Sequence, residues 1–210
     1  MNLITPQLIR NGSALSGLLL VLFVITHLAG LIPAFLAPAT FEAYSSALHR
    51  SSFLPVVEIA LAGSAVVHVG STLTKTIANR SSGNNSRLSS RRQAPLAAMA
   101  SRSKVAAGLV TLVFLVIHLQ QLRWPRPADG GERDALQAVL EHPTSLILYV
   151  AAAVALGLHL LHGAEAAHRS LGWLTPANSL ILRQGGRLIA ALIGGGFLLI
   201  SVGIAWGIAA

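Results

Sequence analysis

Five long apolar stretches alternate with shorter polar segments along the 210-residue chain. A helix needs about 20 apolar residues to cross the hydrocarbon core of a bilayer. The pattern predicts spans near residues 13–36, 54–77, 104–123, 144–168 and 186–208. The first apolar run is too long for a cleavable signal peptide, and no small-residue cleavage site follows it. We therefore expect an all-α membrane protein, with residues 1–210 forming one domain of five transmembrane helices.

The polar segments between these spans differ in character. Residues 39–55 fit either a short amphipathic helix on the membrane surface or an ordered loop. Residues 78–103 are rich in Ser, Asn and Arg without apolar periodicity, which predicts a flexible basic loop. Residues 123–134 are turn-rich and predict a second loop. The last span carries several glycines, including Gly203 and Gly207, and is typical of a structural span or a subunit contact.

Composition supports a membrane location and limits the chemistry. Hydrophobic residues make up 53% of the chain and charged residues only 10%, where a soluble domain carries about a quarter. The mean hydropathy is +0.66. The chain contains no cysteine, so it provides no ligands for an iron–sulfur cluster, no disulfide and no covalent haem attachment of the C-x-x-C-H kind. Any iron–sulfur cluster must belong to a partner protein.

The net charge of +8 is distributed unevenly between the two sides of the expected bundle. Eleven of the fifteen basic residues precede the first span or lie in the segments that join the second span to the third and the fourth to the fifth. The positive-inside rule then puts the amino terminus in the cytoplasm and the carboxyl terminus outside. This placement indicates a multi-pass protein of the cell's inner membrane, in contact with lipid, and argues against nucleic acid as the partner.

Four histidines each lie inside a different apolar span: His27, His68, His118 and His159. An ionisable residue within a membrane span is a functional-site hypothesis by default. His27 and His118 fall in the outer halves of two outward-running helices, and we call them the outer pair. His68 and His159 fall in the inner halves of two inward-running helices, and we call them the inner pair. His162 is an alternative to His159.

Two histidines at each of two depths predict two b-type haems stacked across the membrane. Zinc needs three or four ligands around one point, whereas one histidine from each of two facing helices is the axial pair of a six-coordinate haem. Small residues such as Gly30 and Gly108 leave room for a macrocycle. Six-coordination favours electron transfer over oxygen chemistry. The alternative from a different class is a haem-free anchor or transporter whose histidines pack or relay protons.

Other polar residues are candidates for supporting roles. His49 and Glu58 lie toward the outer side and are candidates for a quinone and proton site, because imidazole and carboxyl groups accept protons. Arg169 lies on the cytoplasmic side of His159 and, with Ser13, is a candidate contact for haem propionates.

In order and spacing, several short motifs resemble the five-helix dihaem cytochrome b anchor of succinate dehydrogenases and menaquinol-dependent fumarate reductases. The resemblance covers nearly the whole chain. The motifs are Ser16-Gly17 ten residues before His27, the segment SSALH followed by Leu54-Pro55 and the helix from Glu58 to His68, Arg102 and Gly108 leading to His118, and H-x-x-x-G at His159 and Gly163 followed by Gly172-Trp173. A departure is His49, where some fumarate reductases have a glutamate.

The resemblance implies a function and partners. It implies that His27 and His118 ligate the outer haem and that His68 and His159, rather than His162, ligate the inner haem. The expected partners are a flavoprotein with covalent FAD and an iron–sulfur protein, both on the cytoplasmic side. The dicarboxylate would bind to these partners and not to this chain. Electrons from succinate, a substrate of the tricarboxylic acid cycle, would reach a membrane quinone, with menaquinone expected. The anchor of another quinone-linked oxidoreductase, such as a nitrate reductase, formate dehydrogenase or hydrogenase, is the alternative.

Overall fold

The computed structural model describes residues 6–81, 95–125 and 130–208, and these residues form helices and no strands. The elements are α1 (Pro6–Leu36), α2 (Pro38–His49), α3 (Leu54–Ser81), α4 (Pro95–His118), the π-helical segment η2 (Leu119–Arg123), α5 (Glu132–Glu141), α6 (Pro143–Ser170) and α7 (Ser179–Ala205). Five of the helices are long and apolar enough to cross a membrane, namely α1, α3, α4 with η2, α6 and α7. The prediction of five spans is confirmed.

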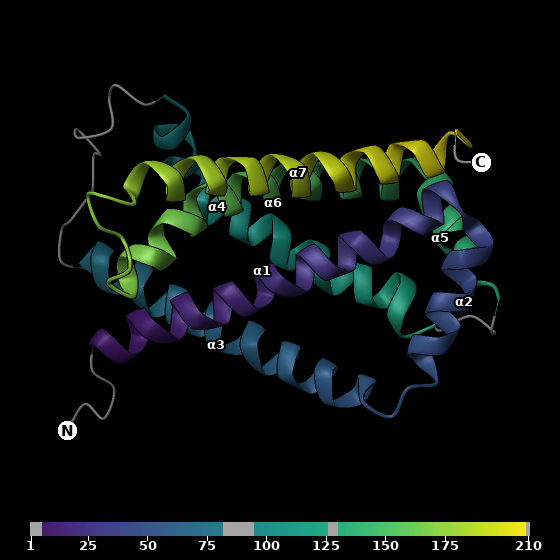
Figure 1. Ribbon diagram of the computed structural model, residues 1–210, viewed down its shortest axis with the longest axis horizontal. Coiled ribbons are helices and arrows are strands. Elements are labelled where there is room, and N and C mark those ends of the chain that lie inside the picture. The colour runs from purple at the N-terminus through teal and green to yellow at the C-terminus, as the bar shows by residue number, and fades with distance from the viewer. Residues whose placement is uncertain (1–5, 82–94, 126–129, 209–210) are drawn as a thin grey trace.

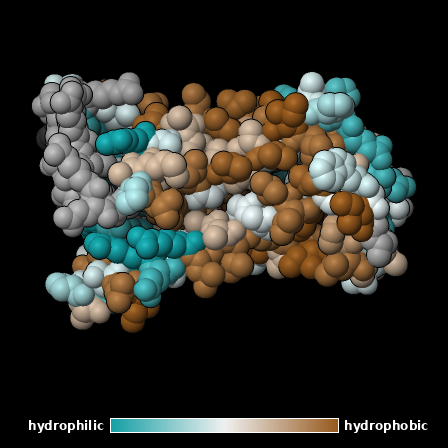
Figure 2. Space-filling model, turned by 90° about the horizontal axis from the view of Figure 1, so that it is seen from above, coloured by the Kyte–Doolittle hydropathy of each residue, from teal (hydrophilic) through white to brown (hydrophobic). Residues whose placement is uncertain are grey.

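The five long helices run along the long axis of the molecule, and the short helices α2 and α5 lie together at one end (Figure 1). The start of α1 lies at the opposite end of the bundle from the end of α7, as an odd number of spans requires. Apolar side chains cover the middle of the surface in Figure 2, and hydrophilic side chains gather toward both ends. This is the distribution expected of a bundle surrounded by lipid along its middle and by water at its two ends.

The helices extend further than the hydropathy pattern predicted. Both ends of the predicted loop 78–103 are helical, because α3 continues to Ser81 and α4 begins at Pro95; the part of this prediction that concerns residues 82–94 lies outside the described residues. Proline is favourable in the first turn of a helix, where its missing N–H has no partner to lose. Helix α3, with 28 residues, is therefore longer than the roughly 20 residues that cross the hydrocarbon core of a bilayer.

The two short helices resolve one prediction and correct another. Residues 38–49 form helix α2, so the surface segment is a helix and not an ordered loop. The turn-rich segment predicted at 123–134 is interrupted, since α5 begins at Glu132. Residues 126–129 lie outside the described residues. Helix α5 is short and stabilised by packing: Leu136 and Leu140, one turn apart on the same face, are buried.

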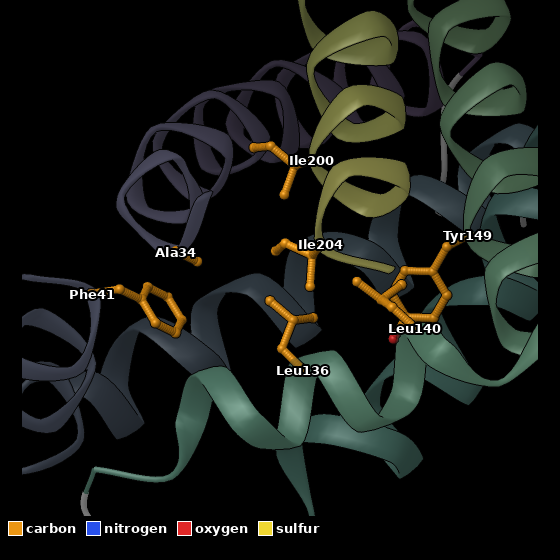
Figure 3. Close-up of a cluster of buried hydrophobic side chains, with 7 residues drawn as sticks. All are labelled: Ala34, Phe41, Leu136, Leu140, Tyr149, Ile200 and Ile204. Atoms are coloured by element: carbon orange, nitrogen blue, oxygen red, sulfur yellow. The ribbon is translucent and has the colours of Figure 1, made fainter. Parts of the chain in front are cut away.

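A compact apolar cluster joins five elements at the α2–α5 end (Figure 3). Its buried members come from α1, α2, α5, α6 and α7, and are Ala34, Phe41, Leu136, Leu140, Tyr149, Ile200 and Ile204. The sticks in Figure 3 show the Leu136 and Leu140 side chains of α5 among residues of the spans. Helix α5 therefore closes this end of the bundle.

Polar contacts fix the same end. The Glu42 carboxylate in α2 accepts hydrogen bonds from the backbone N–H groups of Glu132 (3.2 Å) and Arg133 (2.6 Å), so it satisfies donors at the start of α5. The Arg133 side chain donates from Nε to the Ala34 carbonyl oxygen at 2.8 Å. Residue 38, four positions after Ala34, is a proline without an N–H, so Arg133 replaces a helical hydrogen bond that the sequence removes.

The spans pack as two pairs plus one helix. Helix α3 packs mainly on α1, α4 packs mainly on α6, and α7 lies on α6 and α1, whereas α3 and α4 flank the bundle without packing closely on each other. Close approach of α6 and α7 depends on small residues, because a Cβ added to Gly194 would lie 3.1 Å from the Ala153 carbonyl oxygen and 3.2 Å from the Gly157 Cα.

The predicted packing role of Gly203 and Gly207 holds for one of the two. A Cβ added to Gly203 would collide with the Phe35 ring of α1 at 2.3 Å, so Gly203 belongs to the α1–α7 interface. Gly207 lies beyond the last residue of α7, with φ of +62°, and Ile208 N–H bonds the Gly203 carbonyl oxygen at 3.0 Å. Gly207 therefore ends the helix, because glycine adopts this left-handed conformation without strain.

We predict that Gly194→Ala destabilises the protein by about 1–3 kcal/mol, because the added methyl group meets backbone atoms that cannot move aside easily. Gly195→Ala is the matched control, since a Cβ there meets nothing within 4 Å and alanine favours the helix. Thermal unfolding in detergent measures both. Equal unfolding temperatures for the two variants would contradict the close α6–α7 contact.

Candidate functional site

The structure brings the four membrane histidines together in the two pairs that the sequence predicted. The ring centroids of His27 (α1) and His118 (α4) lie 6.0 Å apart, with the ring planes at 77°. Those of His68 (α3) and His159 (α6) lie 6.1 Å apart, at 75°. His159, and not His162, is the residue of α6 that faces His68.

The two pairs lie at different depths. A Cβ added to Gly17 of α1 would lie 3.0 Å from Cε1 of His68, so Gly17 marks the level of the inner pair. His27 follows ten residues later on the same helix, which is about 15 Å at the α-helical rise. Gly108 and His118 of α4 repeat this arrangement, because a Cβ on Gly108 would lie 3.2 Å from Cε1 of His159. The two layers are therefore separated along both helices by the same distance.

An internal repeat accounts for the matching geometry. A constant offset of 91 residues relates Gly17 to Gly108, Phe23 to Phe114, His27 to His118 and His68 to His159. Residues 17–28 and 108–119 share the pattern G-L-x-x-x-x-F-x-x-x-H-L. The contacts repeat as well: the Phe23 and His27 rings stack at 5.4 Å, and the Phe114 and His118 rings stack at 5.3 Å.

The repeat gives the two pairs a shared symmetry. Helices α1 to α3 correspond to α4 to α6, and each histidine faces its own counterpart in the other half. This arrangement corresponds to a pseudo-two-fold axis along the bundle, because exchanging the two halves of the chain exchanges the two histidines within each pair. Helix α7 follows the second half and has no counterpart. Examining the sequence at this offset would have identified Phe23 and Phe114, which the reasoning from hydropathy missed.

Backbone carbonyl groups lie against the inner pair. The His68 Nδ1 donates to the Ser13 carbonyl oxygen at 3.0 Å, with the Ser16 hydroxyl at 3.5 Å. The His159 Nδ1 is buried and forms no hydrogen bond of ordinary geometry with the described residues. The backbone of Lys104 is the polar group that acts on this ring. Ser13 and Lys104 are again related by the offset of 91. Metal-binding histidines commonly orient their second ring nitrogen in this way, toward a carbonyl oxygen.

Aromatic groups surround the outer pair. The Tyr149 hydroxyl lies 3.1 Å from His118 Nδ1, and Tyr149 is buried. His27 has the Phe23 ring on one side and the Phe197 ring of α7 at 5.9 Å. Sequence reasoning missed Tyr149 because a tyrosine in an apolar span gives no functional signal by itself. Its counterpart in the repeat is Glu58, a residue that the sequence did single out.

The residues fit a metal held between two imidazoles in each layer. Metal–nitrogen bonds of about 2 Å on opposite sides, with roughly 1.1 Å from nitrogen to ring centre, put the ring centroids about 6 Å apart. Ring packing alone also allows this distance; the repetition of the spacing at two depths, each with a glycine against a ring, favours a pair of ligands. The described residues contain no group of three or more histidine, aspartate and glutamate side chains around one point.

The supporting candidates lie at opposite ends of the bundle. His49 Nδ1 lies 2.8 Å from a Glu132 carboxylate oxygen, and the Arg123 Nε donates to Glu58 at 2.6 Å, both at the α2–α5 end. Ser13 lies beside His68 at the level of the inner pair. Arg169 forms an ion pair with Glu165 at the amino-terminal end. Thus Ser13 contacts a histidine of the two pairs directly, whereas Arg169 forms its ion pair away from them.

Comparisons with known proteins assign no family to this arrangement. No protein-family model matches the chain, and neither a curated protein nor a solved structure matches it.

The pairing predicts the outcome of cross-linking, for which the cysteine-free chain is well suited. In the double variant His68→Cys/His159→Cys, a short bifunctional thiol reagent should join α3 to α6, because these residues face each other. The control His68→Cys/His118→Cys combines the two layers, about 15 Å apart along the helices, and should remain unlinked. Mass spectrometry of the linked peptides distinguishes the two. Equal yields from both variants would contradict the layered arrangement.

Proposed function

We propose that the chain is the dihaem cytochrome b membrane anchor of a succinate:quinone oxidoreductase and carries electrons between an iron–sulfur subunit and membrane quinone. The observation that supports this best is the pair of facing histidines at each of two depths, with equal ring spacings of 6.0 and 6.1 Å. The order and spacing of the motifs around them favour the succinate dehydrogenase and fumarate reductase anchors over other quinone-linked cytochromes.

The residues of the chain would hold one haem b in each layer. His27 and His118 would be the axial ligands of the outer haem, and His68 and His159 those of the inner haem. When bound, a six-coordinate haem supplies reversible one-electron transfer. The Ser13 carbonyl orients the imidazole of His68, the Tyr149 hydroxyl orients that of His118, and apolar helices around both layers keep water away. With both histidines of a layer as ligands, the bound haem would favour electron transfer over oxygen chemistry.

The distribution of charge supports the proposed orientation and partners. Among the described residues, the amino-terminal end carries one acidic residue, Glu165, and the basic residues Arg10, Lys75, Arg80, Arg102, Lys104, Arg169, Arg183 and Arg187. The α2–α5 end carries three described basic residues, Arg50, Arg123 and Arg133, and the acidic residues Glu42, Glu58, Glu132, Asp134 and Glu141. A basic end favours the cytoplasmic side of the inner membrane. The FAD-bearing flavoprotein and the iron–sulfur protein would dock there, close to the inner pair, and the second would supply the clusters for which this chain has no cysteine ligands.

The α2–α5 end offers groups for a quinone. Gln121, three residues after His118, has a buried side-chain oxygen that accepts no hydrogen bond from the described residues, while its nitrogen donates to Ser145 at 3.0 Å. Such an oxygen accepts a hydrogen bond from a quinol hydroxyl. Glu58, paired with Arg123, and His49, paired with Glu132, lie at this end and would exchange the protons that accompany two-electron quinone chemistry.

The haem content tests the proposal. We expect a pyridine haemochrome assay of the purified protein to give two haem b per chain, and His68→Ala and His118→Ala each to lose a different one. His142→Ala is the control, because His142 is exposed and bonds Thr144 at the start of α6. Absence of haem from the wild-type protein would refute the proposal, and one haem would show that one pair is not a ligand pair.

A substitution of Glu58 tests the proton site separately from haem binding. We expect Glu58→Gln to slow reoxidation of the reduced haems by a soluble quinone analogue about a hundredfold, because the amide does not exchange the proton. Haem content should stay at two. Glu141→Gln is the matched control at the same end, since Glu141 is exposed and bonds only Gln137 among the described residues. Wild-type kinetics for Glu58→Gln would exclude Glu58 from the quinone site.

A further inference from the structure

Four helices form a ring around the two histidine pairs, and one edge of that ring is open. Helix α1 packs on α3 and on α6, and α4 packs on α6, which closes three edges. The histidine pairs join the diagonals, α1 to α4 and α3 to α6. Helices α3 and α4 form the fourth edge without packing closely, and the ion pair of Arg123 with Glu58 crosses it at the α2–α5 end. We call this fourth edge the open edge.

The internal repeat shows how the open edge differs from its counterpart. The offset of 91 residues relates the α3–α4 edge to the α6–α1 edge, which α7 covers. Ala62 and Val69 share the face of α3 that carries Glu58, one and three turns further along. Both are exposed, Val69 to 36%, whereas their counterparts Ala153 and Leu160 are only 4% and 7% exposed. The same helix face is therefore sealed in the second half of the chain and accessible in the first.

The open edge is not suited to a second helix in the position that α7 takes on the other edge. Helix α7 approaches α6 closely because Gly157 leaves room for Gly194, whose added Cβ would lie 3.2 Å from the Gly157 Cα. The counterpart of Gly157 in α3 is Val66, which is 72% exposed. A branched side chain at this position keeps a helix from approaching as closely. Lipid chains, which need no matching notch, are therefore the expected neighbour of this edge.

The two ends of the bundle give poor access to the outer pair. At the α2–α5 end, α5 covers the bundle with Leu136 and Leu140. A molecule that enters from the amino-terminal end meets the inner pair first, because the outer pair lies about 15 Å further along the helices. The open edge, by contrast, runs beside both layers, since Glu58 and His68 are ten residues apart on α3.

We propose that the open edge is a lateral passage through which haem moves from the bilayer to the outer pair. The inference rests on the proposed function. A porphyrin ring is planar and largely apolar, so it partitions into the hydrocarbon region and can pass edge-on between two helices that do not pack closely. Helices α1, α6 and α7 seal the opposite side of the ring, so the outer haem enters and leaves between α3 and α4.

The test obstructs the passage chemically before haem is added. The chain has no cysteine, so Ala62→Cys provides a single thiol at the open edge, six residues before His68. The full-length protein is produced without haem, modified in detergent with a bulky maleimide and then mixed with haem. We expect this protein to take up no haem at the outer pair, whereas protein modified after loading keeps both haems. A methyl-sized thiol reagent at the same position should leave uptake unchanged.

Ile59→Cys is the matched control. Ile59 is 74% exposed and directly follows Glu58, so its side chain points about 100° away from the open edge. Its modification should leave the uptake of both haems unchanged. Equal uptake by the two modified variants would overturn the lateral passage and leave the proposed function standing. Protection of Ala62→Cys, but not of Ile59→Cys, from an apolar maleimide in native membranes would show that a polypeptide covers the edge, and would overturn the passage as well.

If the haem-free protein does not fold, the loaded protein gives an equivalent readout. Haem is then transferred outward to an excess of a soluble haem-binding protein, and the transfer is followed by absorbance. The bulky adduct on Ala62→Cys should slow the loss of one haem relative to the same adduct on Ile59→Cys. Equal rates of loss would overturn the inference. Absence of haem from the unmodified protein would instead refute the proposed function.

Discussion

The contact between imidazole rings inside an apolar bundle is the constraint on which the rest of this structure depends. Four polar rings have no favourable place in hydrocarbon unless each finds a partner. Here each ring faces its counterpart from the other half of the chain. Gly17 and Gly108 let the rings of His68 and His159 lie directly against the neighbouring helix, because an added Cβ would lie only 3.0 and 3.2 Å from these rings. The glycine positions, the phenylalanine stacks and the layer spacing all follow from this requirement.

The remaining elements hold the two halves together. Helix α5 closes one end with Leu136 and Leu140, while the Glu42 carboxylate satisfies the start of α5 from α2. Helix α7 lies outside the repeat and joins α1 to α6, where Gly194 permits close contact. By contrast, α3 contacts mainly α1, and none of the residues in its most apolar window is buried. The histidine pairs therefore connect helices that do not otherwise pack closely.

Some residues related by the offset of 91 are identical in the two halves, and others differ between them. The histidines, their stacked phenylalanines and the glycines are common to both halves. Lys75 corresponds to Ala166, and Glu58 corresponds to Tyr149. The ammonium group that bonds Ser13 beside His68 therefore has no counterpart in the second half, and the phenol that bonds His118 has a carboxyl group, paired with Arg123, as its counterpart in the first half. The two histidine pairs therefore lie in chemically different environments within a symmetric pair of repeats. Such a difference is compatible with the proposed transfer of electrons from one layer to the other.

Much of the fold follows from the sequence, because spans and depths depend on local pattern alone. Hydropathy gives five spans, and counting residues along helices of known direction puts His27 with His118 and His68 with His159. Helix α5 escaped prediction because its ten residues are too few to form a span and follow a turn-rich segment, although they are good helix formers with Leu136 and Leu140 on one face. The serine that links Lys75 to His68 also required the structure, since contacts between α1 and α3 depend on helix rotation, which spacing does not fix.

Electron paramagnetic resonance of the oxidised, purified protein tests the central claim most directly, because it reports the axial ligands of each iron. Two pairs of facing histidines predict two low-spin ferric haems per chain, each with bis-imidazole ligation. Their signals should differ, because Lys75 lies near one layer and Glu58 and Tyr149 lie near the other. A protein without low-spin haem, or with a high-spin iron that has an open coordination position, would contradict the assignment of both pairs as ligands.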